Sequence, residues 1–196
     1  MNEDFPERLT GPFWHAENYN RDWGGYNSRT IEVNVSNELQ NQVGDLMKEL
    51  KLTLALAESC TGGLLGSRVT DVPGSSVYFP GGVVAYAYEA KVELLGVSWE
   101  TLNTKGAVSR ETVLEMAHGI RRRMNVDISI SVSGIAGPGG GTPEKPVGTT
   151  WIGLVAEDIE RAEMFQFTGD REQNKNFAVE AALQMLLDYL LQNKHP

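Results

Sequence analysis

The stretch of this sequence with the clearest potential for chemistry is Ala57–Gly63, in which a serine, a cysteine and a threonine are followed by two glycines. It comes after the apolar run Leu52–Ala57 and before an amphipathic segment, so its hydroxyl groups lie where a strand turns into a helix. Glycine lets the backbone bend tightly, and N–H groups from Thr61 to Gly63 could receive an anion or a developing oxyanion. An enzyme would hold a nucleophile such as Ser59 here, although glycines after a strand more often form an ordinary turn.

A serine hydroxyl is a poor nucleophile until a base removes its proton. The candidate loops contain no histidine, so a lysine is the natural base. Lys91 closes the segment Tyr86–Lys91 just after an apolar run, where partial burial could lower its pKa and leave a neutral amine. Tyr86 could donate or relay a proton beside it. From spacing alone, a solvated Lys91 paired with a carboxylate and a Tyr86 packed in the core remain the alternatives.

Two further polar residues follow predicted strands and could reach the same site. Ser133 ends the strand Asp127–Val132 and precedes Gly134, so it could place a second hydroxyl or a backbone N–H against the reacting group, or simply cap a turn. Arg171 precedes the last helix, and its planar guanidinium could hold a phosphate or a carboxylate. An ion pair with a neighbouring acid is an equally good interpretation of Arg171.

Other reactive residues are less promising. Cys60 has no neighbouring histidine and is expected to be buried and inert, and His118 lies among apolar helix positions and is expected to pack rather than act as a base. The loop Ser133–Gly148 is rich in glycine and is expected to carry a ligand, but it lacks the Gly-Lys-Ser/Thr ending of a Walker A loop. Three scattered histidines and one cysteine give no zinc spacing, so we expect neither a metal nor a cofactor.

The composition limits the class of protein. A chain of 196 residues with 41% hydrophobic residues can bury a core, and one cysteine excludes an internal disulfide. A net charge of −9 argues against nucleic-acid or anionic-membrane binding, and the one basic run, Arg121–Arg123, fits a helix C-terminus. No apolar stretch reaches the roughly 18 residues of a membrane span. We therefore expect a cytoplasmic protein.

The remaining pattern predicts strands that alternate with helices and so position these residues. Helices are predicted at 37–50, from Gly63 to about Thr70, at Glu89–Leu95, after Ser109 and from Phe177 to Leu190, and strands at Leu52–Ala57, Gly82–Tyr86, Asp127–Val132, Thr149–Ala156 and Ala162–Thr168. The last two strands are close enough to form an antiparallel hairpin. We predict a three-layer α/β/α sandwich with a mixed, mostly parallel sheet.

Two parts of the chain differ in character. Residues 1–35 mix aromatic and polar residues without a period, which indicates an extension that packs on the domain or on a neighbouring subunit, or else a linker remnant. Residues 36–196 carry the regular pattern and are predicted to form one domain.

Several blocks together resemble the carboxy-terminal domain of CinA (competence/damage-inducible) proteins and their stand-alone relatives, the nicotinamide-nucleotide amidases. The matching blocks are Ala57–Gly63, Asp71–Ser76, Gly81–Tyr86, Glu89–Lys91, Gly106–Ser109, Ser133–Pro138, Pro143–Gly148 and Gly169–Glu172. They span about residues 37–192 in the order that the family has. The sequence is therefore identified as a member of this family.

The resemblance implies hydrolysis of nicotinamide mononucleotide to nicotinic acid mononucleotide and ammonia by a homo-oligomer. By position, it implies catalytic roles for Ser59, Lys91 and Tyr86. It implies substrate binding by the residues Thr61, Gly62, Gly63, Ser133, Gly134 and Arg171.

Three departures from the family pattern keep alternatives open. Ala87-Tyr88 stands where members commonly have Ser-Asn, and Lys175 stands where many have an arginine. The aromatic extension stands where full CinA proteins have an amino-terminal pyrophosphatase-like domain. The alternatives are a nucleotide-binding or regulatory protein with the same pocket, and an amidase of another small carboxamide.

Overall fold

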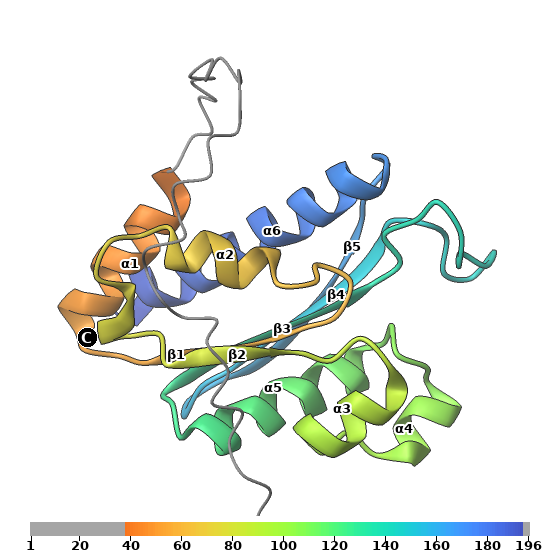
Figure 1. The fold of residues 1–196 in the computed structure, drawn as a ribbon, viewed down its shortest axis with the longest axis horizontal. Helices are drawn as coiled ribbons and strands as arrows, with labels where there is room; N and C mark the ends of the chain where they lie inside the picture. Colours follow the sequence, from red (N-terminus) through yellow and green to blue (C-terminus); the bar gives the residue numbers. More distant parts are fainter. Residues whose placement is uncertain (1–37, 194–196) are drawn as a thin grey trace, which may run out of the picture. The chain divides into compact units, whose positions relative to one another are not determined.

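The structure, a computed structural model, describes residues 38–193. In this part of the chain, one sheet lies between two layers of helices (Figure 1). The helices are α1 (Glu38–Leu50), α2 (Leu64–Thr70), α3 (Tyr88–Leu95), α4 (Trp99–Thr104), α5 (Arg110–Met124) and α6 (Arg171–Asn193), with a short 3₁₀ helix at Ser75–Val77. The strands are β1 (Leu54–Glu58), β2 (Gly81–Val84), β3 (Ile128–Gly134), β4 (Thr149–Val155) and β5 (Glu160–Gln166).

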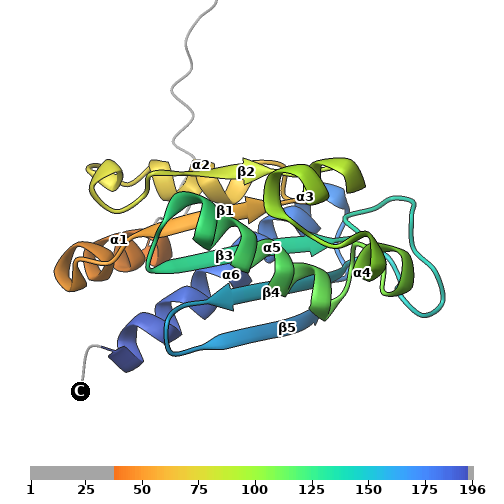
Figure 2. The same ribbon diagram turned by 90° about the horizontal axis from the view of Figure 1, so that it is seen from below.

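The sheet has the order β2-β1-β3-β4-β5. β1 pairs in parallel with β2 and β3, whereas β4 is antiparallel to both β3 and β5, so only β4 runs against the other strands. Figure 2 shows α3, α4 and α5 in front of the sheet and α1 and α6 behind it. The predicted three-layer sandwich with a mixed, mostly parallel sheet and a final hairpin is confirmed.

Alternation along the central strands determines which residues face which helix layer. In β1, Leu54 and Leu56 belong to the core under α1 and α6, whereas Ala55 and Ala57 belong to the core under α3 and α5. β3 follows the same rule, because its isoleucines belong to the α1 and α6 side and its serines face α5. The small residues therefore all lie on the α3 and α5 side.

Small side chains on this side allow α5 and α3 to pack closely. Ser129 Oγ donates to the carbonyl of Ala117 at 2.8 Å, which ties β3 to α5 and satisfies a buried hydroxyl. Between α3 and α5, a Cβ on Gly119 would lie 1.7 Å from the Leu95 carbonyl oxygen, so only glycine fits there. As a result, the first turns of α3 lie close to the carboxyl end of β1.

Several element bounds differ from the predicted ones. The last helix begins at Arg171, which was expected to precede it, and β2 and β5 end two residues earlier than predicted, at Val84 and Gln166. The first strand was expected to end at Ala57, but Glu58 still pairs with Val84 and Val132, because its carboxylate finds buried partners of its own. The six-residue helix α4 was not predicted. The predicted extension at residues 1–35 lies outside the described residues.

Candidate active site

Ser59 lies one residue beyond β1, at the sheet edge where the parallel strands end. Its N–H donates to the Val132 carbonyl at 2.9 Å, so the backbone still follows the strand pairing. By the alternation of β1, its side chain is on the same side as Ala55 and Ala57, where α3 packs. Glu58, one residue earlier, points to the opposite side of the sheet and contacts α2.

Glu58 anchors the turn that carries Ser59. Its carboxylate, only 3% exposed, accepts hydrogen bonds from the N–H groups of Gly63 at 2.9 Å, Leu65 at 3.1 Å and Gly66 at 2.8 Å. These are donors that the start of a helix leaves without intrahelical partners. No role was predicted for Glu58, although an acid at the end of an apolar strand, just before a helix, is the signal that would have found it.

Lys91 reaches Ser59 from the second turn of α3. Its Nζ lies 2.9 Å from Ser59 Oγ and 2.7 Å from the carbonyl oxygen of Ala85, and the side chain is 1% exposed. The interpretation of Lys91 as a solvated residue paired with a carboxylate is wrong, because its partners are a hydroxyl and a carbonyl. A buried lysine without a carboxylate partner is costly, and such lysines are concentrated at functional sites.

Burial lowers the pKa of Lys91 from 10.5 to about 8, and the nearby Cys60 opposes this shift. A neutral amine has two N–H donors and one lone pair. If one N–H donates to the Ala85 carbonyl, the lone pair is free to accept the proton of Ser59 Oγ. The arrangement is therefore that of a nucleophile with its general base.

The predicted oxyanion donors need a correction. The Gly62 N–H already donates to the Ser59 carbonyl at 3.1 Å, and the Gly63 N–H donates to the Glu58 carboxylate at 2.9 Å. In the described residues, the N–H groups of Cys60 and Thr61 have no oxygen acceptor. Both N–H groups lie against the sulfur of Cys60, which is only a weak acceptor. They therefore remain the groups that this turn could offer to an oxyanion, whereas those of the glycines are engaged.

Tyr86 and Arg171 form one wall of the cleft. Arg171 donates from Nη2 to the hydroxyl of Tyr86 at 2.8 Å and from Nη1 to the carbonyl of Gly137 at 2.6 Å. The interpretation of Arg171 as a partner of a neighbouring acid is wrong. Tyr86 is 59% exposed rather than packed in the core, and its hydroxyl contacts Arg171, whereas Lys91 approaches only its backbone carbonyl, at 3.5 Å.

Ser133 and Gly134 form the floor at the end of β3. The Ser133 hydroxyl is buried and donates to the Ala107 carbonyl at 2.8 Å, so it ties the loop after α4 to the sheet. A Cβ on Gly134 would lie 2.4 Å from Thr150 Oγ1, so β3 and β4 leave room only for glycine. With Ser59, Tyr86, Lys91, Arg171 and the loop 135–140, these residues line a cleft of about 260 Å³.

The glycine-rich loop is held in place by two side chains that sequence reasoning did not single out. Asn174, buried on α6, donates to the carbonyls of Ala136 at 3.1 Å and Gly169 at 2.9 Å. Lys145 donates to the carbonyls of Lys105 and Val108, both at 2.7 Å. Neither residue has a signal in the sequence, because their partners are backbone atoms of distant loops.

Cys60 is buried as predicted, and His118 is half-buried but pairs with an acid instead of packing only against apolar side chains. Burial raises the pKa of the Cys60 thiol to about 11, so it is a poor nucleophile. His118 lies away from the cleft, where its Nε2 contacts Glu160 Oε2 at 2.7 Å. Cys60 lines the cleft beside Ser59 and His118 does not, and neither side chain forms a hydrogen bond with Ser59 or Lys91 in the described residues.

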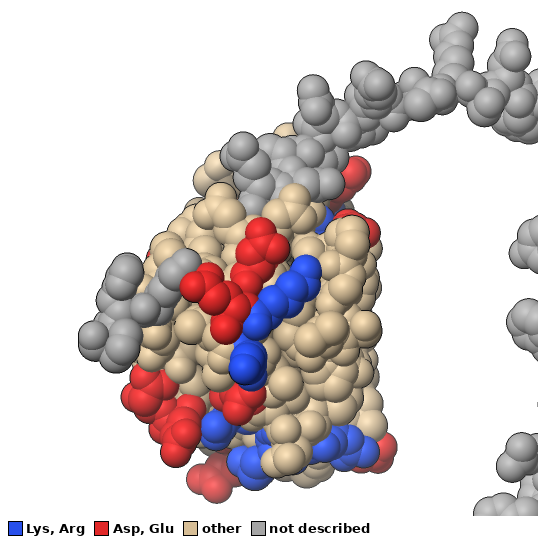
Figure 3. All heavy atoms as spheres, turned by 90° about the vertical axis from the view of Figure 1, so that its left-hand side faces the viewer, with Lys and Arg blue, Asp and Glu red and all other residues tan. Residues whose placement is uncertain are grey.

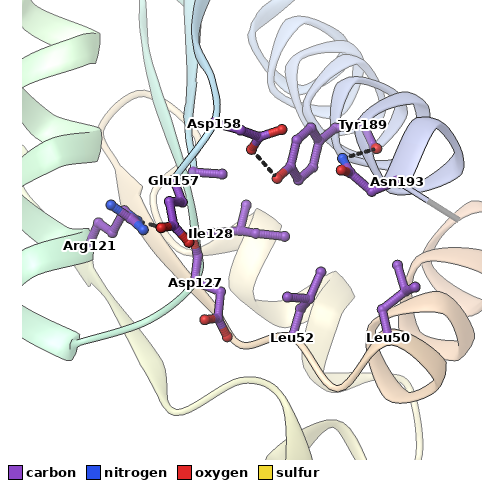
Figure 4. A pocket seen from close by; sticks show the side chains of 10 residues that line it. Leu50, Leu52, Arg121, Asp127, Ile128, Glu157, Asp158, Tyr189 and Asn193 are labelled. Carbon is purple, nitrogen blue, oxygen red and sulfur yellow. Dashed lines mark hydrogen bonds between the residues drawn. The ribbon is translucent and has the colours of Figure 1, made fainter. Parts of the chain in front are cut away.

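A larger cavity of about 490 Å³ lies at the other end of the sheet, between the end of α1, the start of β3 and the end of α6 (Figure 4). Tyr189 donates there to Asp158 at 2.7 Å, and burial together with this bond raises the pKa of Tyr189. Acidic and basic side chains are interspersed on this end of the molecule (Figure 3). None of the predicted catalytic or binding residues lines this cavity.

Within residues 38–193, no group of three or more His, Cys, Asp and Glu side chains is placed to hold a metal ion. Within the same residues, no helix is long and apolar enough to cross a membrane.

The fold and the site define a three-layer α/β domain with a buried Ser–Lys pair at the carboxyl edge of its parallel strands. Residues 36–190 match the CinA C-terminal domain family, and the chain belongs to this family. It is 54% identical over 154 residues to a CinA-like protein of Chlorobaculum tepidum, covering 76% of this chain and 36% of that protein. It is 48% identical over 153 residues to a CinA-like protein of Thermotoga maritima, covering 78% and 37%. The chain thus spans a little over a third of these relatives.

Solved structures of the family have the same fold. The competence/damage inducible protein CihA from Agrobacterium tumefaciens is 40% identical, with a TM-score of 0.76 over 78% of this chain and 93% of that one. A CinA superfamily protein from Klebsiella pneumoniae is 35% identical, with a TM-score of 0.77 over 80% and 98%. The described domain therefore corresponds to nearly the whole of each solved chain.

Proposed function

We propose that this domain is a metal-independent amidohydrolase that converts nicotinamide mononucleotide to nicotinic acid mononucleotide and ammonia. The observation that carries the proposal is the 2.9 Å contact between Lys91 Nζ and Ser59 Oγ, made by a lysine that is 1% exposed. A serine with a neutral lysine supplies both a nucleophile and a base for opening an amide. The nucleotide is proposed from the resemblance of the blocks around Ser59, Ser133 and Arg171 to the nicotinamide-nucleotide amidases.

In the first half of the reaction, Lys91 takes the proton of Ser59 as its oxygen attacks the carboxamide carbon. The N–H groups of Cys60 and Thr61 hold the developing oxyanion. The carbon–nitrogen bond then breaks, and the proton carried by Lys91 is returned to the leaving nitrogen. Ammonia departs, and the acyl group remains as an ester on Ser59.

In the second half, water attacks the ester and Lys91 takes one of its protons. The carbon–oxygen bond to Ser59 breaks, the hydroxyl is restored, and the carboxylate product leaves. Tyr86 and Arg171 hold the substrate at the wall of the cleft, and Tyr86 offers a second hydroxyl from which a proton could be supplied. Ser133 and Gly134 support the floor.

The test is to incubate the protein with nicotinamide mononucleotide, with and without a chelator, and to measure ammonia and nicotinic acid mononucleotide. We expect equal release in both conditions, and loss of at least a thousandfold in Ser59→Ala and Lys91→Ala. Circular dichroism of both variants checks that the fold is intact. Near-normal turnover by a folded Ser59→Ala variant would contradict the mechanism.

The same experiment separates the alternatives. Calorimetric binding of the nucleotide without ammonia release would favour a binding or regulatory protein. Release from another small carboxamide, but not from the nucleotide, would favour an amidase of different specificity.

We also propose that the protein is a cytoplasmic homo-oligomer, as expected for an enzyme of nucleotide recycling with the family's assembly. Light scattering that finds only a 21.5 kDa particle would contradict the homo-oligomer.

A further inference from the structure

A second hollow adjoins the Ser59 cleft on the far side of Arg171. It measures about 440 Å³ and is lined by Leu64, Arg171, Glu172, Lys175 and Asn176, from the starts of α2 and α6. Arg171 lines both hollows. A ligand whose reactive end lies at Ser59 could therefore extend past Arg171 into this second space.

Lys175 is unusual among the basic side chains of residues 38–193. Most of these side chains form a hydrogen bond or an ion pair with a carboxylate, a carbonyl or a hydroxyl. Those that form neither are Lys51, Arg122 and Lys175. Lys51 and Arg122 are exposed to water, whereas Lys175 is half-buried. A half-buried ammonium group without a partner gives up hydration and gains nothing from the protein in return.

The amine of Lys175 lies over the catalytic turn. Its Nζ is 3.9 Å from the position that a Cβ on Gly62 would take, and Gly62 is three residues after Ser59. Asp170 accepts from the N–H of Gln173 at 2.9 Å, so the amino-terminal end of α6 is already capped. The charges available to a ligand here are therefore those of side chains. Within this hollow, Arg171 and Lys175 are cationic and Glu172 is anionic.

We propose that Lys175, with Arg171, forms a subsite for the phosphate monoester of the nucleotide substrate. This inference rests on the proposed function. In nicotinamide mononucleotide the carboxamide and the phosphate lie at opposite ends. When Ser59 attacks the carboxamide, the phosphate must therefore bind at some distance from Ser59. A free ammonium group beside a guanidinium is the chemistry that recognises a phosphate.

The experiment compares nicotinamide mononucleotide with nicotinamide riboside, which lacks the phosphate. In Lys175→Met we expect KM for the nucleotide to rise about tenfold or more with little change in kcat, because a charged hydrogen bond is lost. The kinetics with the riboside should change less than twofold. Lys175→Arg should restore KM for the nucleotide, and Glu172→Gln should lower it. Arg122→Met removes the same charge from an exposed site on α5 and serves as the matched control.

The outcomes separate this proposal from the proposed function. Equal effects of Lys175→Met on both substrates, or equal effects of Lys175→Met and Arg122→Met, would overturn the phosphate subsite while leaving the amidase intact. If the wild type hydrolyses neither compound, the amidase fails, and calorimetry with the nucleotide then decides the subsite. Weaker nucleotide binding by Lys175→Met than by Arg122→Met supports it, and equal binding or no binding overturns it.

Discussion

Replacing Lys91 with methionine should make the domain more stable at neutral pH while removing its proposed base. Burial lowers the pKa of Lys91 from 10.5 in its ordinary environment to about 8. A difference of about 2.5 pH units corresponds to about 3.4 kcal/mol of destabilisation at pH 7, with little solvent screening at 1% exposure. Methionine has a similar length but loses the two hydrogen bonds to Ser59 and Ala85, each contributing about 1 kcal/mol. The net gain is about 1–2 kcal/mol.

The pH dependence gives the sharper test. Between pH 8 and 10.5 the unfolded chain binds a proton at Lys91 that the folded chain lacks, so wild-type stability rises with pH through this window. The advantage of Lys91→Met should therefore be full below pH 8 and vanish near pH 9, where the remaining destabilisation of the wild type equals the roughly 2 kcal/mol of lost hydrogen bonds. By about pH 10.5 the variant should be the less stable protein by about 2 kcal/mol. Urea unfolding at intervals from pH 7 to 10.5 measures it, with the exposed Lys51→Met as the control. A pH-independent difference between Lys91→Met and the wild type would refute the reasoning.

Three further outcomes are expected. The kcat/KM for the nucleotide should rise about tenfold from pH 7 to 9 with a midpoint near 8, as Lys91 loses its proton; a profile that is flat across this range would exclude it as the base. Cys60→Ala should change kcat less than about threefold, and iodoacetamide should alkylate the folded protein slowly at pH 8, because the pKa of the thiol is about 11. Glu58→Gln should lower the free energy of unfolding by about 2 kcal/mol and also lower kcat, since the variant has one acceptor oxygen for three N–H groups. An unchanged kcat would mean that the turn keeps its shape without the carboxylate.

The local pattern of the sequence was enough to predict most of the fold. The strands and the longer helices have clear periods of two or 3.6 residues, and the hairpin of β4 and β5 follows from a short acidic connection. Helix α4 was missed because six residues provide too few turns for a period to be recognised. The end of β1 was misplaced because a glutamate is normally expected at the surface. Only the tertiary structure supplies the N–H groups that allow the Glu58 carboxylate to be buried.

The site was predicted unevenly for a similar reason. Ser59 could be located from the strand-to-helix turn, but the contact of Lys91 with Ser59 joins residues 32 positions apart. Those of Arg171 with Gly137 and Tyr86 join residues 34 and 85 positions apart. Spacing alone favoured a solvated Lys91 and left Arg171 open, and it was the family's blocks that pointed to the cleft. Asn174 had no signal at all, since its partners are carbonyls brought to it by two loops.

The alternation of β1 explains how one turn can hold both a stabilising carboxylate and a reactive hydroxyl. Glu58 and Ser59 are neighbours, so their side chains point to opposite sides of the sheet. On one side, Glu58 holds the start of α2 and thereby shapes the turn, and on the other, Ser59 meets Lys91 from α3. Glu58 is not among the causes of the shifted pKa of Lys91, so the buried acid shapes the site without raising the affinity of the lysine for its proton. A carboxylate on the Lys91 side would pair with the amine and raise its pKa, whereas this separation leaves the pKa at about 8, so that the amine becomes a neutral base at only slightly alkaline pH.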